Sequence, residues 1–182
     1  MEVTRIHDGL WRWSIPGPDG CARASTYLEH GRDIILIDPV LPPPGDDLDR
    51  FHRAIDHDTQ RLAGGVRILL TCSGHLRDSA SLADRTGAVL WTPGDGDPPA
   101  GMVALPSGLV DEVALWSPVH RVLIVGHAVA MRDGHLVAAP GADVASMSLL
   151  APHAIIPAHG LAIVTGAADA LQRAARQGIE EG

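Results

Sequence analysis

The sequence predicts an α/β fold in which two β-sheets pack together with helices outside them. Its first forty residues contain three strand-like runs separated by Gly, Pro and Asp turn signals, a pattern typical of an antiparallel meander. Beyond Pro42, short apolar runs alternate with amphipathic helical segments. An antiparallel block followed by alternating strands and helices favours two packed sheets with outer helices.

Individual elements follow from these patterns. Strands are predicted at Leu10 to Ile15, Ala24 to Glu29, Asp33 to Val40, Val66 to Leu70, Ala88 to Thr92, Met102 to Leu105, Val110 to Ser117, Arg121 to Val125, His135 to Ala138 and Ala154 to Pro157. Helices are predicted at Asp46 to Leu62, Leu76 to Arg85, Asp143 to Leu150 and Ala167 to Gln177. In the first helix, Asp46 or Asp47 is the expected N-cap, and Gly64-Gly65 is the expected end.

Length and composition limit the function classes. The 182 residues, 46% of them hydrophobic, can bury one core, so residues 1–182 are predicted to form a single domain. The net charge is −8 and the arginines are scattered among acids, which argues against a nucleic-acid partner. Two cysteines, Cys21 and Cys72, are too few for a disulfide framework.

No membrane association is expected. The longest apolar runs, such as Ile34 to Ile37, are far shorter than the roughly 20 residues that a spanning helix requires. The residues after Met1 lack the basic and then apolar order of a signal peptide, which predicts a soluble, cytoplasmic protein.

Potential metal ligands follow three of the predicted strands. The segment Thr71 to Ser79 follows the strand Val66 to Leu70 and contains His75 and Asp78. His127 and His159 follow two later strands. Because α/β sites form beyond the carboxyl ends of strands, these side chains are candidates for one metal site.

The order of these segments resembles the metallo-β-lactamase superfamily over nearly the whole chain. The matching segments are the early strand that ends in Asp38, the strand and loop Val66 to Asp78 in place of the family's His-x-His-x-Asp-His segment, His120 to His127 in place of the segment that ends in Gly-Asp, and Ile155 to Gly160 in place of the closing His-Gly. The resemblance implies a four-layer αββα sandwich with two mixed sheets.

The metal-binding signature departs from the family pattern at several positions. Thr71 is followed by Cys72, Ser73 and Gly74, and Ser79 replaces the last His of the motif. No His occurs in Leu105 to Leu109, where the family has one after a Gly. His127 replaces the bridging Asp, whereas His159 matches the family pattern unchanged.

This partial set implies one metal ion instead of two. Asp78, His127 and His159, with His75 as a fourth ligand or a proton-transfer group, suit zinc or iron and would leave one position for a water molecule. His75 and Asp78 are accordingly the candidate catalytic residues. The implied function is a metallo-β-lactamase-like hydrolase that acts on an ester, amide or thioester.

Other interpretations remain open. The chain could be a metal-free relative that binds a small molecule or a protein, or pairs with itself as a homodimer, with Asp78 capping a helix or pairing with Arg77 or Arg85 and His75 facing solvent. Cys72 could also be a nucleophile with His75 as its base, but the sequence identifies no third, orienting group. Metal analysis and the convergence of the candidate ligands separate these interpretations.

Overall fold

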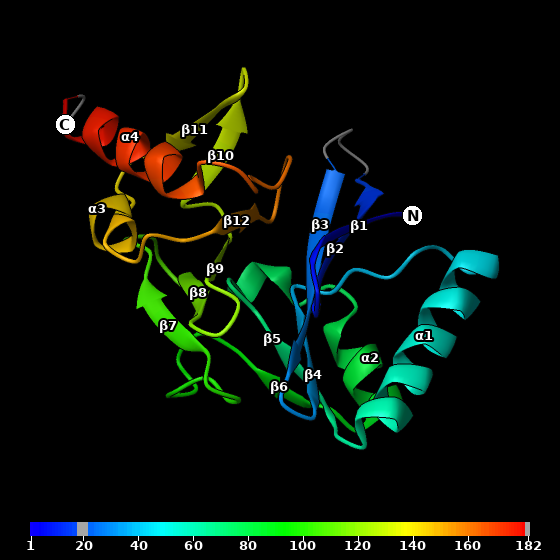
Figure 1. The fold of residues 1–182 in the computed structure, drawn as a ribbon. Helices are drawn as coiled ribbons and strands as arrows, with labels where there is room; N and C mark the ends of the chain where they lie inside the picture. Colours follow the sequence, from blue (N-terminus) through cyan, green and yellow to red (C-terminus); the bar gives the residue numbers. More distant parts are fainter. Residues whose placement is uncertain (18–21, 181–182) are drawn as a thin grey trace. The chain divides into compact units, whose positions relative to one another are not determined.

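A computed structural model of the chain describes residues 1–17 and 22–180 (Figure 1). Cys21 and residues 18–20 of the predicted turn lie outside the described residues. The chain divides into two compact units: unit 1 comprises Met1–Leu70 and Gly74–Thr92, and unit 2 comprises Thr71–Ser73 and Pro93–Gly182. The single domain 1–182 stays a prediction. Within the described residues, no helix has both the length and the apolar character needed to cross a membrane.

Unit 1 contains a mixed six-stranded sheet in the order β1-β2-β3-β4-β5-β6. The first four strands are antiparallel neighbours, and β4, β5 and β6 run parallel. The elements are β1 (Glu2–His7), β2 (Leu10–Pro16), β3 (Ala22–His30), β4 (Asp33–Ile37), α1 (Asp46–Leu62), β5 (Val66–Leu69), α2 (Ser79–Thr86) and β6 (Val89–Trp91). A short 3₁₀ turn, η1 (Ser73–His75), precedes α2.

One apolar core joins the two helices of unit 1 to its sheet. Phe51 and Ile55 of α1 and Leu82 of α2 are buried in the same cluster as Ile34 and Ile68 of the strands. Both helices therefore cover one face of this sheet, and the carboxyl ends of the parallel strands β4 and β5 lead into the loops that carry Asp38 and His75.

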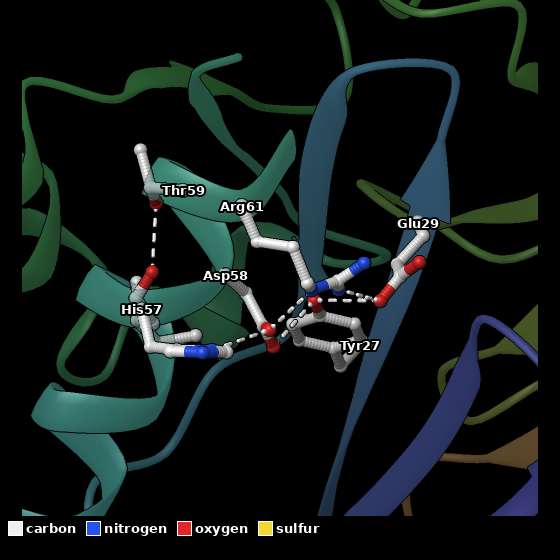
Figure 2. A network of polar contacts seen from close by, with 7 residues as sticks. Tyr27, Glu29, His57, Asp58, Thr59 and Arg61 are labelled. Carbon is white, nitrogen blue, oxygen red and sulfur yellow. Dashed lines mark hydrogen bonds and ion pairs between the residues drawn. The ribbon is translucent and has the colours of Figure 1, made fainter. Parts of the chain in front are cut away.

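A network of hydrogen bonds and ion pairs connects α1 to β3 at the surface of unit 1 (Figure 2). The Tyr27 hydroxyl donates to Asp58 at 3.0 Å, and the Arg61 guanidinium contacts both Asp58 and Glu29. Burial, followed by the nearby Asp58 carboxylate, raises the pKa of Tyr27 above its ordinary value. This hydroxyl therefore remains a hydrogen-bond donor at neutral pH, and the network stabilises the unit.

Unit 2 contains a mixed four-stranded sheet in the order β12-β9-β8-β7 and a separate hairpin formed by β10 and β11. Its core contains residues of the sheet, such as Leu123 and Ile155, together with Met147 and Leu171 of the helices. The elements are β7 (Val103–Pro106), β8 (Val113–Ser117), β9 (Val122–Val125), β10 (Val129–Arg132), β11 (His135–Ala138), α3 (Val144–Ser148), β12 (Ala154–Pro157) and α4 (Ala167–Glu180).

The α/β class and the two mixed sheets are confirmed, with local corrections. The N-cap of α1 is Gly45, and neither Asp46 nor Asp47 caps it, because both lie within the first turn of the helix. The Asp47 carboxylate accepts instead from the N-terminal amine of Met1. The strand that begins at Asp33 ends at Ile37, since Asp38 takes a left-handed φ of 49°. The predicted set of strands lacks β1 and β10.

Candidate metal centre

The site in unit 2 begins where the loop after β5 pairs with the start of β8. The Ser73 N–H donates to the Asp111 carbonyl at 3.2 Å, and the Val113 N–H donates to the Thr71 carbonyl at 2.8 Å. These two bonds place Cys72 directly opposite Glu112 in an antiparallel bridge. Residues forty positions apart in the sequence thus become neighbours.

Glu112 is a buried carboxylate with both oxygens engaged. Its Oε1 accepts the backbone N–H groups of His127 and Ala128, each at 2.8 Å, and its Oε2 lies 2.8 Å from Nδ1 of His127. Burial by itself would raise the pKa of Glu112, but the hydrogen bonds from His127 and Ala128 outweigh it and hold this pKa below its ordinary value. Glu112 is therefore ionised at neutral pH.

His127 and His159 reach the same edge of the unit 2 sheet because β9 and β12 are parallel. Val125 pairs with Pro157, and each histidine follows its strand end by two residues. The two imidazole rings lie with their centroids 5.4 Å apart. The side chain of His127 is 49% exposed, so its ring is accessible although its carboxylate partner is buried.

Three potential ligands of unit 2 cluster tightly. The Sγ of Cys72, a carboxylate oxygen of Glu112 and a ring nitrogen of His127 lie within 4.8 Å of one another. Cys72 is a partly exposed cysteine. Thiolate and imidazole together suit zinc or ferrous iron far better than magnesium or calcium, which prefer oxygen ligands. The cluster is compatible with a metal site.

Comparison with solved structures identifies the fold. The chain resembles VMB-1 over 99% of its length and 97% of that chain, with a TM-score of 0.64 and 11% identity. It also resembles the DIM-1 metallo-β-lactamase over 100% of its length and 97% of that chain, with a TM-score of 0.55 and 11% identity. The chain has the metallo-β-lactamase fold.

The chain also resembles the metallo-β-lactamase from Erythrobacter litoralis. The match covers 98% of this chain and 92% of that chain, with a TM-score of 0.57 and 12% identity. No family model matches the sequence, and no curated protein matches it. The predicted metallo-β-lactamase fold is confirmed, whereas identities this low leave activity and substrate to be proposed from the chain's own residues.

In unit 1, His75 forms a pair with a carboxylate. Nδ1 of His75 lies 3.1 Å from an Asp38 carboxylate oxygen, and both side chains are almost completely buried. The loop that carries Asp38 is held in place, because the Ser25 hydroxyl donates to the Asp38 carbonyl and the Trp13 indole N–H donates to the Val40 carbonyl, both at 2.8 Å. The idea that His75 faces solvent is therefore wrong.

Asp78 supports the same loop of unit 1. Its carboxylate accepts the backbone N–H of Leu41 at 2.8 Å. Asp78 is the N-cap residue of α2 by position, but its side chain makes no capping bond. Arg85, a suggested partner, pairs with Asp56 instead. A role of Asp78 and His75 in metal binding or catalysis stays a prediction.

A cavity of about 660 Å³ lies in unit 2 next to the loop that follows His159. Its wall is mostly apolar and includes Met131, Leu161 and Ile163, and Arg173 and Asp169 of α4 are among its polar lining residues. The loop approaches the hairpin closely, since a Cβ on Gly160 would lie 3.3 Å from Cβ of Met131. The cavity thus adjoins a segment that begins at a candidate ligand.

Sequence reasoning missed Glu112. No motif surrounds it, and its partner His127 is fifteen residues away. Within the metallo-β-lactamase fold, the usable signal was an acidic residue directly before the largely buried strand Val113–Ser117. Such a residue requires a partner, because a buried charge is stable only when paired or hydrogen-bonded.

Proposed function

We propose that this chain is a metal-dependent hydrolase that binds a single zinc or iron ion in unit 2 through Cys72, His127 and His159. The observation that carries the proposal is the cluster of Cys72, Glu112 and His127 within 4.8 Å, with the ring of His159 beside that of His127. Two imidazoles and one thiolate form a three-ligand set that leaves a coordination position open.

The metal ion and the residues of the chain would contribute different parts of the chemistry. An ion held by Cys72, His127 and His159 would supply Lewis-acid chemistry, lowering the pKa of a water molecule and polarising a carbonyl group. Glu112 holds the ring of His127 by its Nδ1 and fixes the backbone at Ala128. An ester, amide or thioester is the proposed substrate class. Asp78 and His75 remain the proposed additional ligand and proton-transfer group, which single variants test.

The adjoining cavity supports a substrate with an apolar group. We propose that the acyl or leaving group of the substrate lies against Met131, Leu161 and Ile163, because apolar groups gain free energy when such a surface excludes water. Its volume of about 660 Å³ suffices for a small organic molecule. A metal-free binding module is the alternative that metal analysis decides, and size-exclusion chromatography tests the proposed homodimer.

Metal analysis tests the proposal directly. Protein purified without nickel or chelator should contain close to one equivalent of zinc or iron. We expect Cys72→Ser, His127→Ala and His159→Ala each to weaken zinc binding by roughly 10- to 100-fold or more. His153→Ala is the matched control, because His153 is an exposed histidine of the same unit. Substoichiometric zinc, iron and manganese in the native protein would refute the proposal.

A second candidate function rests on the same three residues. Cys72, His127 and Glu112 provide a thiol, an imidazole base and an orienting carboxylate, which are the parts of a cysteine hydrolase that needs no metal. Hydrolysis of model thioesters in the presence of chelator separates the two candidates. The metal-dependent enzyme should lose activity with chelator and regain it with zinc, whereas a cysteine hydrolase should keep its activity and lose it to iodoacetamide.

A further inference from the structure

The hydrogen bonds around Glu112 fix how its carboxylate is oriented. Backbone N–H groups can only donate, so the Oε1 atom that contacts the N–H groups of His127 and Ala128 is an acceptor of two bonds. The other oxygen, Oε2, then lies 2.8 Å from Nδ1 of His127. The carboxylate cannot turn without breaking both backbone bonds.

Close packing at Gly126 holds this arrangement. A Cβ at Gly126 would lie 2.7 Å from Oε2 and 2.8 Å from Cδ of Glu112, and 3.0 Å from the Thr71 hydroxyl oxygen. Such distances are shorter than van der Waals contact, so only glycine fits while Glu112 stays in place. The Glu112 carboxylate is thus confined by the backbone on one side and by Gly126 on the other.

This geometry determines which nitrogen of His127 carries the proton. An ionised carboxylate accepts hydrogen bonds and donates none, so Nδ1 must be the protonated nitrogen in this contact. In a neutral imidazole the other nitrogen, Nε2, then keeps its lone pair. The half-exposed ring can present that lone pair away from the buried carboxylate.

We infer that Glu112 is a positioning residue that fixes the Nδ1–H tautomer of His127 and thereby makes Nε2 the metal-binding nitrogen. The inference rests on the proposed function, in which His127 is a ligand. Glu112 itself stays outside the coordination sphere, because three donors already occupy its oxygens and its side chain is 2% exposed. The pairing of a ligating histidine with a carboxylate is a general way to orient an imidazole.

The tautomer can be measured in metal-free protein. Long-range ¹H–¹⁵N correlation spectra of chelated, ¹⁵N-labelled full-length protein distinguish Nδ1–H from Nε2–H imidazoles, and the His127→Gln variant assigns the His127 signals. We expect the Nδ1–H form in the wild type. An Nε2–H tautomer would overturn the inference, whatever the metal content.

Glu112→Gln reverses the expected tautomer with little change in shape. Its carboxamide oxygen can still accept the two backbone N–H groups, which turns the NH₂ group toward Nδ1 and requires Nδ1 to accept. We expect His127 to become the Nε2–H form and zinc affinity to fall roughly 10- to 100-fold. Asp38→Asn, which changes the corresponding pair in unit 1, should leave the tautomer of His127 unchanged.

The outcomes separate this inference from the proposed function. Lost zinc affinity in Glu112→Gln with an unchanged Nδ1–H tautomer would make Glu112 a ligand and overturn the positioning role. An unchanged tautomer with unchanged affinity would overturn it too. If the tautomer reverses as expected but wild-type protein binds no zinc or iron, the proposed function fails while the assignment of Glu112 stands.

Discussion

Each unit contains a histidine paired through Nδ1 with a carboxylate whose side chain is only 2% exposed, and the histidines of these two pairs differ in exposure. In unit 1, His75 lies 3.1 Å from Asp38, with side chains 4% and 2% exposed. In unit 2, His127 lies 2.8 Å from Glu112, with side chains 49% and 2% exposed. The carboxylate is buried in both pairs, but only the imidazole of unit 2 is open to solvent.

This difference in exposure predicts that the unit 1 pair contributes mainly to folding stability and the unit 2 pair mainly to metal binding. Removal of a buried partner leaves a polar group without water to replace the lost bond, so the cost falls on folding. The imidazole of His127 is half exposed, so water can solvate the groups that its loss uncovers, and its loss should affect stability less and ligand binding more. Variants of the unit 1 pair should therefore lower the free energy of unfolding, whereas variants of the unit 2 pair should weaken metal binding.

The largest expected effect is on the stability of unit 1. Asp38→Ala removes the partner of buried His75 and places alanine at a φ of 49°, so we expect a loss of about 3 kcal/mol in the free energy of unfolding. Urea unfolding followed by tryptophan fluorescence reports mainly on this unit, because Trp11, Trp13 and Trp91 lie there and only Trp116 lies in unit 2.

Asp38→Asn is the matched control for this prediction. Asparagine tolerates the left-handed conformation and its carbonyl oxygen can accept the bond from Nδ1–H, so most of the stability should remain. Equal losses in the two variants would assign the effect to the charge of Asp38, and would contradict the role of the hydrogen bond and the backbone conformation.

The second prediction concerns Gly126 in unit 2. Gly126→Ala should displace the Glu112 carboxylate, because the new Cβ would lie 2.7 Å from Oε2, and we expect a loss of about 2 kcal/mol in stability together with weaker zinc binding. Calorimetric titration with zinc and urea unfolding measure the two effects. Gly65→Ala is a suitable control, because its Cβ would meet only an Asp33 oxygen at 3.7 Å. Unchanged zinc affinity in Gly126→Ala would contradict the importance of the Glu112 position.

Local patterns in the sequence predicted elements that depend on local residues. The bounds of α1 follow from its apolar face and are confirmed at Asp46 and Leu62. The two missed strands had a signal as well, since β1 and β10 each precede an Asp-Gly pair that forms a two-residue hairpin turn, at Asp8-Gly9 and Asp133-Gly134. Attention to these two dipeptides would have recovered both strands.

Of the pairs that depend on long-range contacts, the sequence predicted His127 with His159, but not Glu112 with Cys72 or Asp38 with His75. His127 and His159 stood out because each follows a strand, and parallel pairing of β9 with β12 brings them together. Glu112 and Cys72 meet only through a bridge between segments forty residues apart, which no periodicity reveals. Asp38 is paired with His75 by the packing of loops and not by any spacing in the sequence.

The smallest expected stability effect is at the exposed imidazole. In chelated protein, His127→Ala should lower the free energy of unfolding by about 1 kcal/mol or less, because its ring is half exposed and water can replace it at Glu112. His75→Ala should cost clearly more, since its ring is buried. Equal losses would remove the distinction between a structural pair and a functional pair.

The stabilisation of the folded protein by zinc gives a second measurement that compares His127 with His75. A ligand that binds only the folded protein stabilises it, by about 2.7 kcal/mol at a concentration 100 times its dissociation constant. Wild-type protein should show such a shift in urea unfolding, and His127→Ala should lose it although its metal-free stability is nearly normal. His75→Ala then tests the remaining prediction: loss of the zinc-dependent shift would make His75 a ligand as well, whereas a retained shift on a less stable protein would confine it to the structural pair with Asp38.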